Sequence, residues 1–289
     1  MSDPSADRVG PQPPVVPVRA CTPNNVSDAD PDACVDGRRM SLGDHIDELR
    51  QRLIVSLLVF GVFFLAGLFA YRQLWVAIQM PLGWTAEILQ KEPQDLVTFL
   101  WLGPLEGFVA ILRINLLISL VFAFPVMAHQ AWGFLAPGLT HREKRAVAMI
   151  FTAGSFLFFL GVFVAFRYAA VFGMEFLIGF NQTLDGSIDR WTGDYYVSFI
   201  TMLCLGFGIG FETPLVMMAL AKVGLITPAS IMRYWRHAML GAVILGAVFT
   251  PPDPFTQIML ATIMAALFFV GYLLACWVQP RQTGPARDG

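Results

Sequence analysis

GFGIGFETPLVMM, residues 206–218, is an almost wholly apolar stretch that nevertheless carries a carboxylate, Glu212, and a proline, Pro214. Proline has no N–H to donate to a helix, and its ring clashes with the preceding turn. Three glycines precede the carboxylate, and small residues let a neighbouring helix approach closely. The stretch therefore predicts a kinked, closely packed helix in apolar surroundings.

The composition extends this interpretation to the whole chain. Of its 289 residues, 56% are hydrophobic and 14% are charged, and the mean hydropathy is +0.62, which is typical of an integral membrane protein. A helix needs about 20 largely apolar residues to cross a bilayer. We therefore expect an all-α membrane protein with six spans, placed at the uncharged runs 53–71, 114–140, 146–166, 195–211, 238–252 and 254–280.

The fifth of these runs is the shortest. His237 precedes it and the hairpin sequence TPPDPF (250–255) ends it, so its helix reaches only ~20 Å at a rise of 1.5 Å per residue. We expect the fifth and sixth spans to be short.

Charge predicts the orientation in the membrane. Most Lys and Arg residues fall on one side if the amino terminus is inside, and the positive-inside rule then places both termini in the cytoplasm. The Pro- and Asp-rich residues 1–39 predict a disordered cytoplasmic tail, residues 40–278 the membrane domain, and residues 279–289 a short cytoplasmic tail. The bases form no single stripe, which disfavours nucleic-acid binding.

Two segments outside the spans have recognisable patterns. SLGDHIDELRQRLIV (41–55) places Leu42, Ile46, Leu49 and Leu53 at helical spacing, which predicts an amphipathic helix at the inner membrane surface, leading into the first span. Residues 72–107 contain three tryptophans among short amphipathic pieces, which predicts a structured outer cap.

Several motifs resemble one family, in its order and spacing. They are HIDELRQRL (45–53), FPVMAHQAWGFLAPGL (124–139), THREKR (140–145), GFETP (210–214) and TPPDPF (250–255). Together they resemble TatC, the twin-arginine translocase subunit, over about residues 40–278. The chain departs from the family pattern at the outer end of the third span, where it has Phe166 and Arg167 and no following proline.

The resemblance implies a concave six-helix bundle that is a non-enzymatic receptor without cofactor or metal. It would bind twin-arginine signal peptides of folded precursors and work with TatA- and TatB-type single-span subunits and other copies of itself. Export would cross the bacterial cytoplasmic membrane, driven by the protonmotive force. Matching positions are Glu48, Leu49, Arg50, Phe134 and Glu143 for the signal peptide, Glu212 and Asp253 for intramembrane contacts, and Pro81, Pro125 and Pro214 for kinks or caps.

The acids make chemical sense as receptors for arginine. A guanidinium group is a planar fork that binds a carboxylate through charge-assisted hydrogen bonds, and Glu48 and Glu143 are cytoplasmic acids on segments that could meet. Each has a simpler interpretation. Glu48 and Arg52 are spaced i, i+4 and can form an ordinary surface pair, and Glu143 can cap the helix that follows Thr140.

Glu212 and Asp253 also have two interpretations each. Glu212 would lie ~15 Å from the cytoplasmic end of its helix, where an ionisable group is a functional candidate by default; the alternative is a protonated acid bonded to a carbonyl freed by the kink. Asp253 stands in a Pro-rich hairpin and can serve the turn alone.

Two other classes of protein are disfavoured. An intramembrane metalloprotease would need H-E-x-x-H, which HREKR (141–145) lacks. A secondary transporter with Glu212 as its ion site would be expected to show an internal repeat, and none is evident.

Overall fold

The structure is a computed structural model, and its described residues fall within one of the two units into which the chain divides, unit 41–289. The predicted tails 1–39 and 279–289, and Asp253, lie outside the described residues. The description covers residues 42–92, 97–135, 141–183, 190–222, 224–249 and 254–278.

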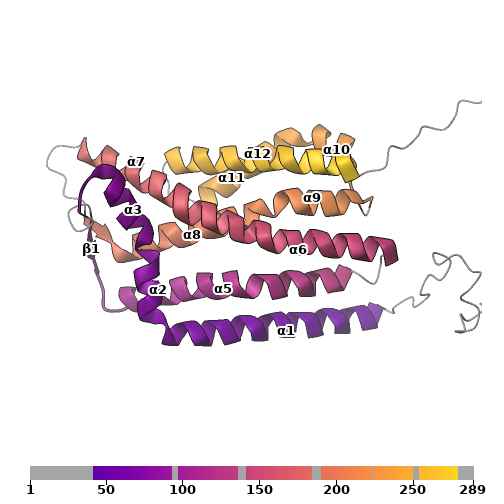
Figure 1. Ribbon diagram of the computed structural model, residues 1–289, viewed down its shortest axis with the longest axis horizontal. Coiled ribbons are helices and arrows are strands. Elements are labelled where there is room, and N and C mark those ends of the chain that lie inside the picture. The colour runs from indigo at the N-terminus through magenta and orange to yellow at the C-terminus, as the bar shows by residue number, and fades with distance from the viewer. Residues whose placement is uncertain are drawn as a thin grey trace, which may run out of the picture. The chain divides into compact units, whose positions relative to one another are not determined.

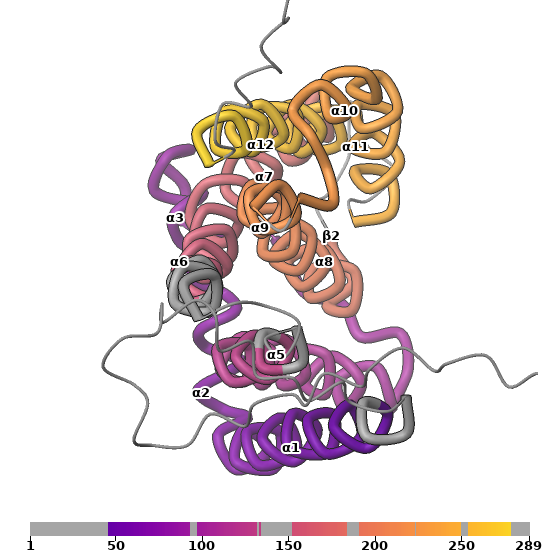
Figure 2. The backbone as a smooth tube through the Cα atoms, turned by 90° about the vertical axis from the view of Figure 1, so that its right-hand side faces the viewer, coloured from indigo at the N-terminus to yellow at the C-terminus, as the bar shows by residue number. Residues whose placement is uncertain are grey.

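Among the described residues, five helical segments are long and apolar enough to cross a bilayer. They lie in α1 (Leu42–Phe69), α5 (Glu106–Leu135), the continuous α6 (His141–Val164), η3 (Ala165–Ala169) and α7 (Ala170–Gln182), the broken pair α8 (Gly193–Phe211) and α9 (Thr213–Lys222), and α12 (Pro254–Val278). Viewed along the helices, α1 packs on α5, α5 on α6 and α8, and α9 on α12 (Figure 2). The predicted helical membrane fold is confirmed.

The predicted amphipathic helix runs directly into the first candidate span. Its described residues belong to α1, which continues without interruption for 28 residues, about 42 Å at 1.5 Å per residue. Its position at the inner membrane surface stays a prediction. Ile46 and Leu53 are each 65% exposed, so this apolar face is directed outward.

The carboxyl-terminal helices differ from each other in length. After the short α10 (Pro228–Arg233), α11 (Trp235–Phe249) has 15 residues, in agreement with a short fifth span. A short sixth span is wrong, because α12 has 25 residues. α11 ends at Phe249, before the prolines of the TPPDPF sequence, and the apolar sequence after Pro254 continues as helix to Val278.

A structured cap follows α1, as predicted, and lies at the end of the bundle where α1 ends (Figure 1). It contains α2 (Tyr71–Ile78), α3 (Met80–Leu89) and β1 (Thr98–Leu100). The sequence did not predict that β1 pairs in parallel with β2 (Arg190–Thr192). Trp75 packs on Phe99 and Trp101, with ring centroids 5.9 and 5.7 Å apart. We call this end the cap end.

The third span is longer than its uncharged run. Arg167 ends that run, yet the helix passes through it in the π-helical turn η3 and continues to Gln182. The Arg167 guanidinium lies 4.6 Å from the ring centroid of Trp84 in α3. A cation over an indole face is attracted by the ring quadrupole, and this partner allows the helix to carry a charge here.

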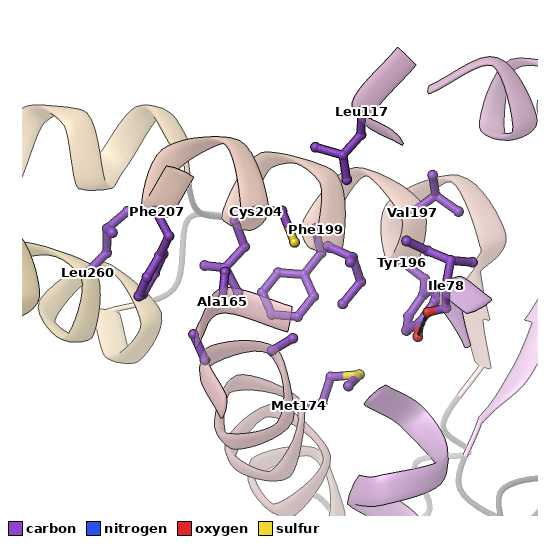
Figure 3. Packing of buried hydrophobic residues seen from close by; sticks show 14 of the residues in the cluster. Ile78, Leu117, Ala165, Met174, Tyr196, Val197, Phe199, Cys204, Phe207 and Leu260 are labelled. Carbon is purple, nitrogen blue, oxygen red and sulfur yellow. Dashed lines mark hydrogen bonds between the residues drawn. The ribbon is translucent and has the colours of Figure 1, made fainter. Parts of the chain in front are cut away.

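The core is centred on α8, which crosses α6 closely. A Cβ built on Gly161 of α6 would lie 2.7 Å from the backbone oxygen of Phe207, so only glycine allows this approach. Buried side chains from α8, including Tyr196 and Phe199, gather there with Met174 of α7 (Figure 3). The Tyr196 hydroxyl donates to the backbone oxygen of Ile78 at 2.7 Å, which joins the core to the cap.

Candidate recognition and partner sites

Three helix ends lie at the end of the bundle opposite the cap. There α1 begins, α5 ends and α6 begins (Figure 1). The sequence places Glu48 in the second turn of α1, Phe134 at the end of α5 and Glu143 in the first turn of α6. We call this the charged end, because the segments 44–52 and 141–145 carry its acids and bases. All three predicted positions therefore belong to the same end of the molecule.

Glu48 forms the ion pair that its spacing allows. Arg52 donates to Glu48 Oε1 from both Nε, at 3.1 Å, and Nη2, at 2.5 Å. The Glu48 side chain is 19% exposed and that of Arg52 is 28% exposed, so this is not an ordinary surface pair. Glu48 Oε2 is buried and accepts no hydrogen bond from any described residue. Both donors therefore serve one oxygen and leave the other without a partner.

The pair faces α5. A Cβ built on Gly133 of α5 would coincide with the Arg52 guanidinium. The guanidinium consequently occupies the space that a side chain at position 133 would fill. The i, i+4 spacing predicts the pair. It does not predict this position against Gly133, which we call the seat of Arg52, because Gly133 belongs to another helix.

The remaining recognition residues are described to different extents. Leu49 is 46% exposed and Arg50 is exposed, so both can be reached from outside the bundle. The backbones of Phe134 and Glu143 are helical, and their side chains lie outside the described residues. The alternative role of Glu143 as a helix cap depends on that side chain and stays a prediction.

Glu212 marks the break in the fourth span. The helix stops after Phe211 and restarts at Thr213, and Pro214 is buried in the first turn of α9. The Glu212 side chain is half-buried and lies against α6, because a Cβ built on Gly154 would be 2.8 Å from Glu212 Oε2. Oε1 is buried without a hydrogen-bond partner, so that oxygen is not bonded to a carbonyl freed by the kink.

The other two prolines occupy different environments. Pro81 is buried in the first turn of α3, a position where its missing N–H has no helical partner to lose. Pro125 stands inside α5, and the helix continues through it to Leu135.

Two polar contacts between helices, one partly exposed and one buried, were not singled out from the sequence. Arg113 of α5 donates from Nη1 to Asp194 Oδ1 at 2.8 Å and to Ser198 Oγ at 3.0 Å, both on α8. Asn115, fully buried, donates to the backbone oxygen of Phe64 at 2.8 Å. The only signal available was the presence of these polar residues in an apolar segment.

These observations define a class of protein. It is a helical membrane protein with a carboxylate at the charged end, a second carboxylate within a broken span, and a structured cap at the opposite end. In the part of the chain that the structure describes, no three His, Cys, Asp or Glu side chains come together as a metal site would require.

Comparison with known proteins identifies the family. The model of the Sec-independent protein translocase protein TatC matches residues 44–262, and the chain belongs to this family. It is therefore a subunit of the Sec-independent protein translocase, a transport component and not an enzyme.

Relatives come from bacteria and chloroplasts. TatC of Helicobacter pylori strain 26695 is 35% identical over 83% of this chain and 88% of its own length, and TatC of Azotobacter chroococcum is 32% identical over 86% and 94%. The chloroplast TATC of rice is 32% identical over 82% of this chain, which spans 63% of that longer protein.

Solved structures share the fold. Two crystal structures of the twin-arginine translocase receptor TatC, one of them in the detergent DDM, superpose with TM-scores of 0.67 and 0.71. Each is 29% identical to this chain, and the matches cover 81% and 80% of this chain and 99% of each solved chain.

Proposed function

We propose that this subunit is the receptor for twin-arginine signal peptides of folded precursor proteins. In this role it binds the peptide at the charged end and organises TatA- and TatB-type single-span partners, together with further copies of itself. Export driven by the protonmotive force would cross a bacterial cytoplasmic membrane. The solved relatives, described as twin-arginine translocase receptors, support this assignment.

The observation that carries the proposal is the position of Glu48. Its carboxylate lies where α1 packs on the end of α5, and α6, with Glu143 in its first turn, begins at the same end of the bundle. Two acids at one end of the bundle suit two adjacent arginines, because a guanidinium binds a carboxylate through a planar pair of N–H donors.

The neighbouring residues extend the proposed site. Leu49 and Arg50 are exposed beside Glu48, and Phe134 ends the adjoining helix. Leu49 offers apolar contact to the apolar part of a signal peptide, and we propose the same role for Phe134. Lys222 ends α9 at the charged end (Figure 1), and basic residues at this end favour its placement in the cytoplasm, with both termini.

Glu212 and Asp253 are proposed to contact partner helices. A carboxylate within a span is costly unless it meets a polar group, and Glu212 Oε1 has none. A polar residue on the single span of a TatA- or TatB-type partner would supply one. Asp253 lies in the hairpin between α11 and α12, outside the described residues.

The test is peptide binding to the full chain in lipid nanodiscs. A fluorescent signal peptide with Arg-Arg is compared with its Lys-Lys counterpart, on the wild type and on Glu48→Gln and Glu143→Gln. We expect each exchange to weaken binding at least about tenfold, which corresponds to one charge-assisted pair. Glu87→Gln, an exposed acid of α3 at the cap end, is the matched control. Equal affinities throughout would contradict the proposal.

A further inference from the structure

We propose that Arg52 is an internal ligand of the recognition site, a guanidinium that occupies Glu48 until the arginine of a signal peptide displaces it. This inference rests on the proposed function and adds its regulation. The resting site is closed by a group of the same chemistry as its ligand, and binding is an exchange of one guanidinium for another.

The geometry of the pair leaves room for a better partner. Arg52 directs both Nε and Nη2 to a single carboxylate oxygen, Oε1. In the favourable fork arrangement, two N–H groups bind the two oxygens separately. Here Glu48 Oε2 is buried and accepts no hydrogen bond from any described residue. At rest, therefore, only one of the two carboxylate oxygens is bonded. A guanidinium approaching from a separate chain is free of the short i, i+4 tether and can engage both oxygens.

A competing explanation is that Arg52 merely orients Glu48 and presents it to the peptide. In that case the unbonded oxygen would be open to the ligand. Glu48 Oε2 is buried instead, and the carboxylate is covered on the side of α5 by the Arg52 guanidinium itself. A ligand that binds Oε1 therefore displaces Arg52, which occupies that oxygen at rest.

The Arg52 side chain has a defined position at rest and enough exposure to leave it. Its guanidinium lies on the bare Cα of Gly133, in space that any other residue would fill with its Cβ. Its side chain is 28% exposed, so it can swing outward without opening the helix packing. The seat holds Arg52 in place at rest, and its loss should favour the open site.

Displacement predicts a specific pattern of affinities. If a ligand binds only the open site, its apparent dissociation constant is the intrinsic constant divided by the open fraction. Removing Arg52 then strengthens binding of Arg-Arg and Lys-Lys peptides by the same factor and leaves their ratio unchanged. An orienting residue would have the opposite effect, because its removal weakens binding.

The experiment measures both peptides on the full chain in nanodiscs. We expect Arg52→Gln to lower both dissociation constants about tenfold, within the usual range of coupling between sites. The gain should vanish when Glu48→Gln is already present, because an uncharged amide no longer holds Arg52. Arg72→Gln, which removes an arginine at the cap end, is the matched control and should change neither affinity.

A second variant removes the seat and keeps every charge. Gly133→Ala places a Cβ where the guanidinium lies and should shift both affinities in the same direction as Arg52→Gln. It protects the test if Arg52→Gln folds poorly, which a thermal melt of each variant would reveal.

The outcomes separate the two proposals. Weaker or unchanged peptide binding in Arg52→Gln and Gly133→Ala, with Glu48→Gln still losing affinity, overturns the internal ligand and leaves the receptor function standing. Binding that ignores both Glu48→Gln and the Arg-Arg to Lys-Lys exchange overturns the receptor function, and the internal ligand with it.

Discussion

Glu48 and Glu212 are held in similar ways and differ in their countercharge. Each is half-buried, and among the described residues each keeps one oxygen buried without a hydrogen-bond partner. Each site also involves a glycine of a neighbouring helix. Glu48 reaches Gly133 through the guanidinium of Arg52, whereas Glu212 lies directly on Gly154. Among the described residues, no ion pair includes Glu212.

The difference separates two kinds of polar site in a membrane protein. A carboxylate with a mobile countercharge near the helix ends can exchange that charge for a ligand at modest cost. A carboxylate inside a span has no countercharge to exchange, and apolar surroundings penalise its unmet hydrogen bonds. Glu48 is thus suited to reversible recognition, and Glu212 to a contact that completes an otherwise unfavourable site.

The largest expected effect is the loss of export on changing Glu212. We expect Glu212→Ala to lower the export rate of a twin-arginine precursor at least about tenfold, as for a polar group that a partner must contact within the membrane. The free energy of unfolding should change by less than about 1 kcal/mol, because the carboxylate brings an unsatisfied oxygen into the fold. A precursor-export assay in membrane vesicles, with a thermal melt beside it, measures both.

Glu175→Ala is the matched control, since it removes a carboxylate from the neighbouring span, in α7. It should leave export unchanged. Normal export by Glu212→Ala would refute the intramembrane role, and a large loss of stability would make Glu212 part of the packing instead.

The contrast also shows what a sequence can predict. The runs without charge locate the helices, and Pro214 with its glycines locates the break at Glu212, because both signals are local. The i, i+4 spacing likewise predicts the Glu48–Arg52 pair. Its direction toward Gly133 depends on how α1 packs on α5, and no local pattern contains that information.

The failures have the same origin. The charge of Arg167 looked like the end of the third span, since its partner, the ring of Trp84, is far away in the sequence. The pairing of β1 with β2 joins equally distant segments. The sixth span, predicted to be short together with the fifth, has 25 residues, because the apolar sequence that begins at Pro254 is uninterrupted.

A smaller effect distinguishes two glycines on α6. A Cβ on Gly161 meets the backbone of α8, whereas one on Gly154 meets the carboxylate of Glu212. We expect Gly161→Ala to lower the free energy of unfolding by about 1–3 kcal/mol, the usual cost of overpacking, because backbone cannot move aside. Gly154→Ala should cost less than about 1 kcal/mol, since a side chain can rotate away.

The displacement of the Glu212 carboxylate can be measured by its rate of labelling with a hydrophobic carbodiimide. Glu212 should be modified faster in Gly154→Ala than in the wild type, because its carboxylate is pushed off α6. Gly161→Ala, compared at a temperature where it is fully folded, serves as the reference. If the two glycines proved equally costly to fill and Glu212 kept its wild-type labelling rate, the contact with Gly154 would not be what holds the carboxylate.

The smallest expected effect is the change in stability on filling Gly133. The group that a Cβ would meet there is the end of a long, flexible arginine, and a helical glycine replaced by alanine gains up to about 1 kcal/mol of helix propensity. The two contributions oppose each other, so the free energy of unfolding of Gly133→Ala should stay within about 0.5 kcal/mol of the wild type. Glu48 should nevertheless react faster with a water-soluble carbodiimide, because its countercharge has lost its seat. A near-neutral melt with faster labelling of Glu48 would show that the countercharge at the charged end is exchangeable, whereas a clear loss of stability with unchanged labelling would make Arg52 a fixed part of the α1–α5 packing and remove the distinction from Glu212.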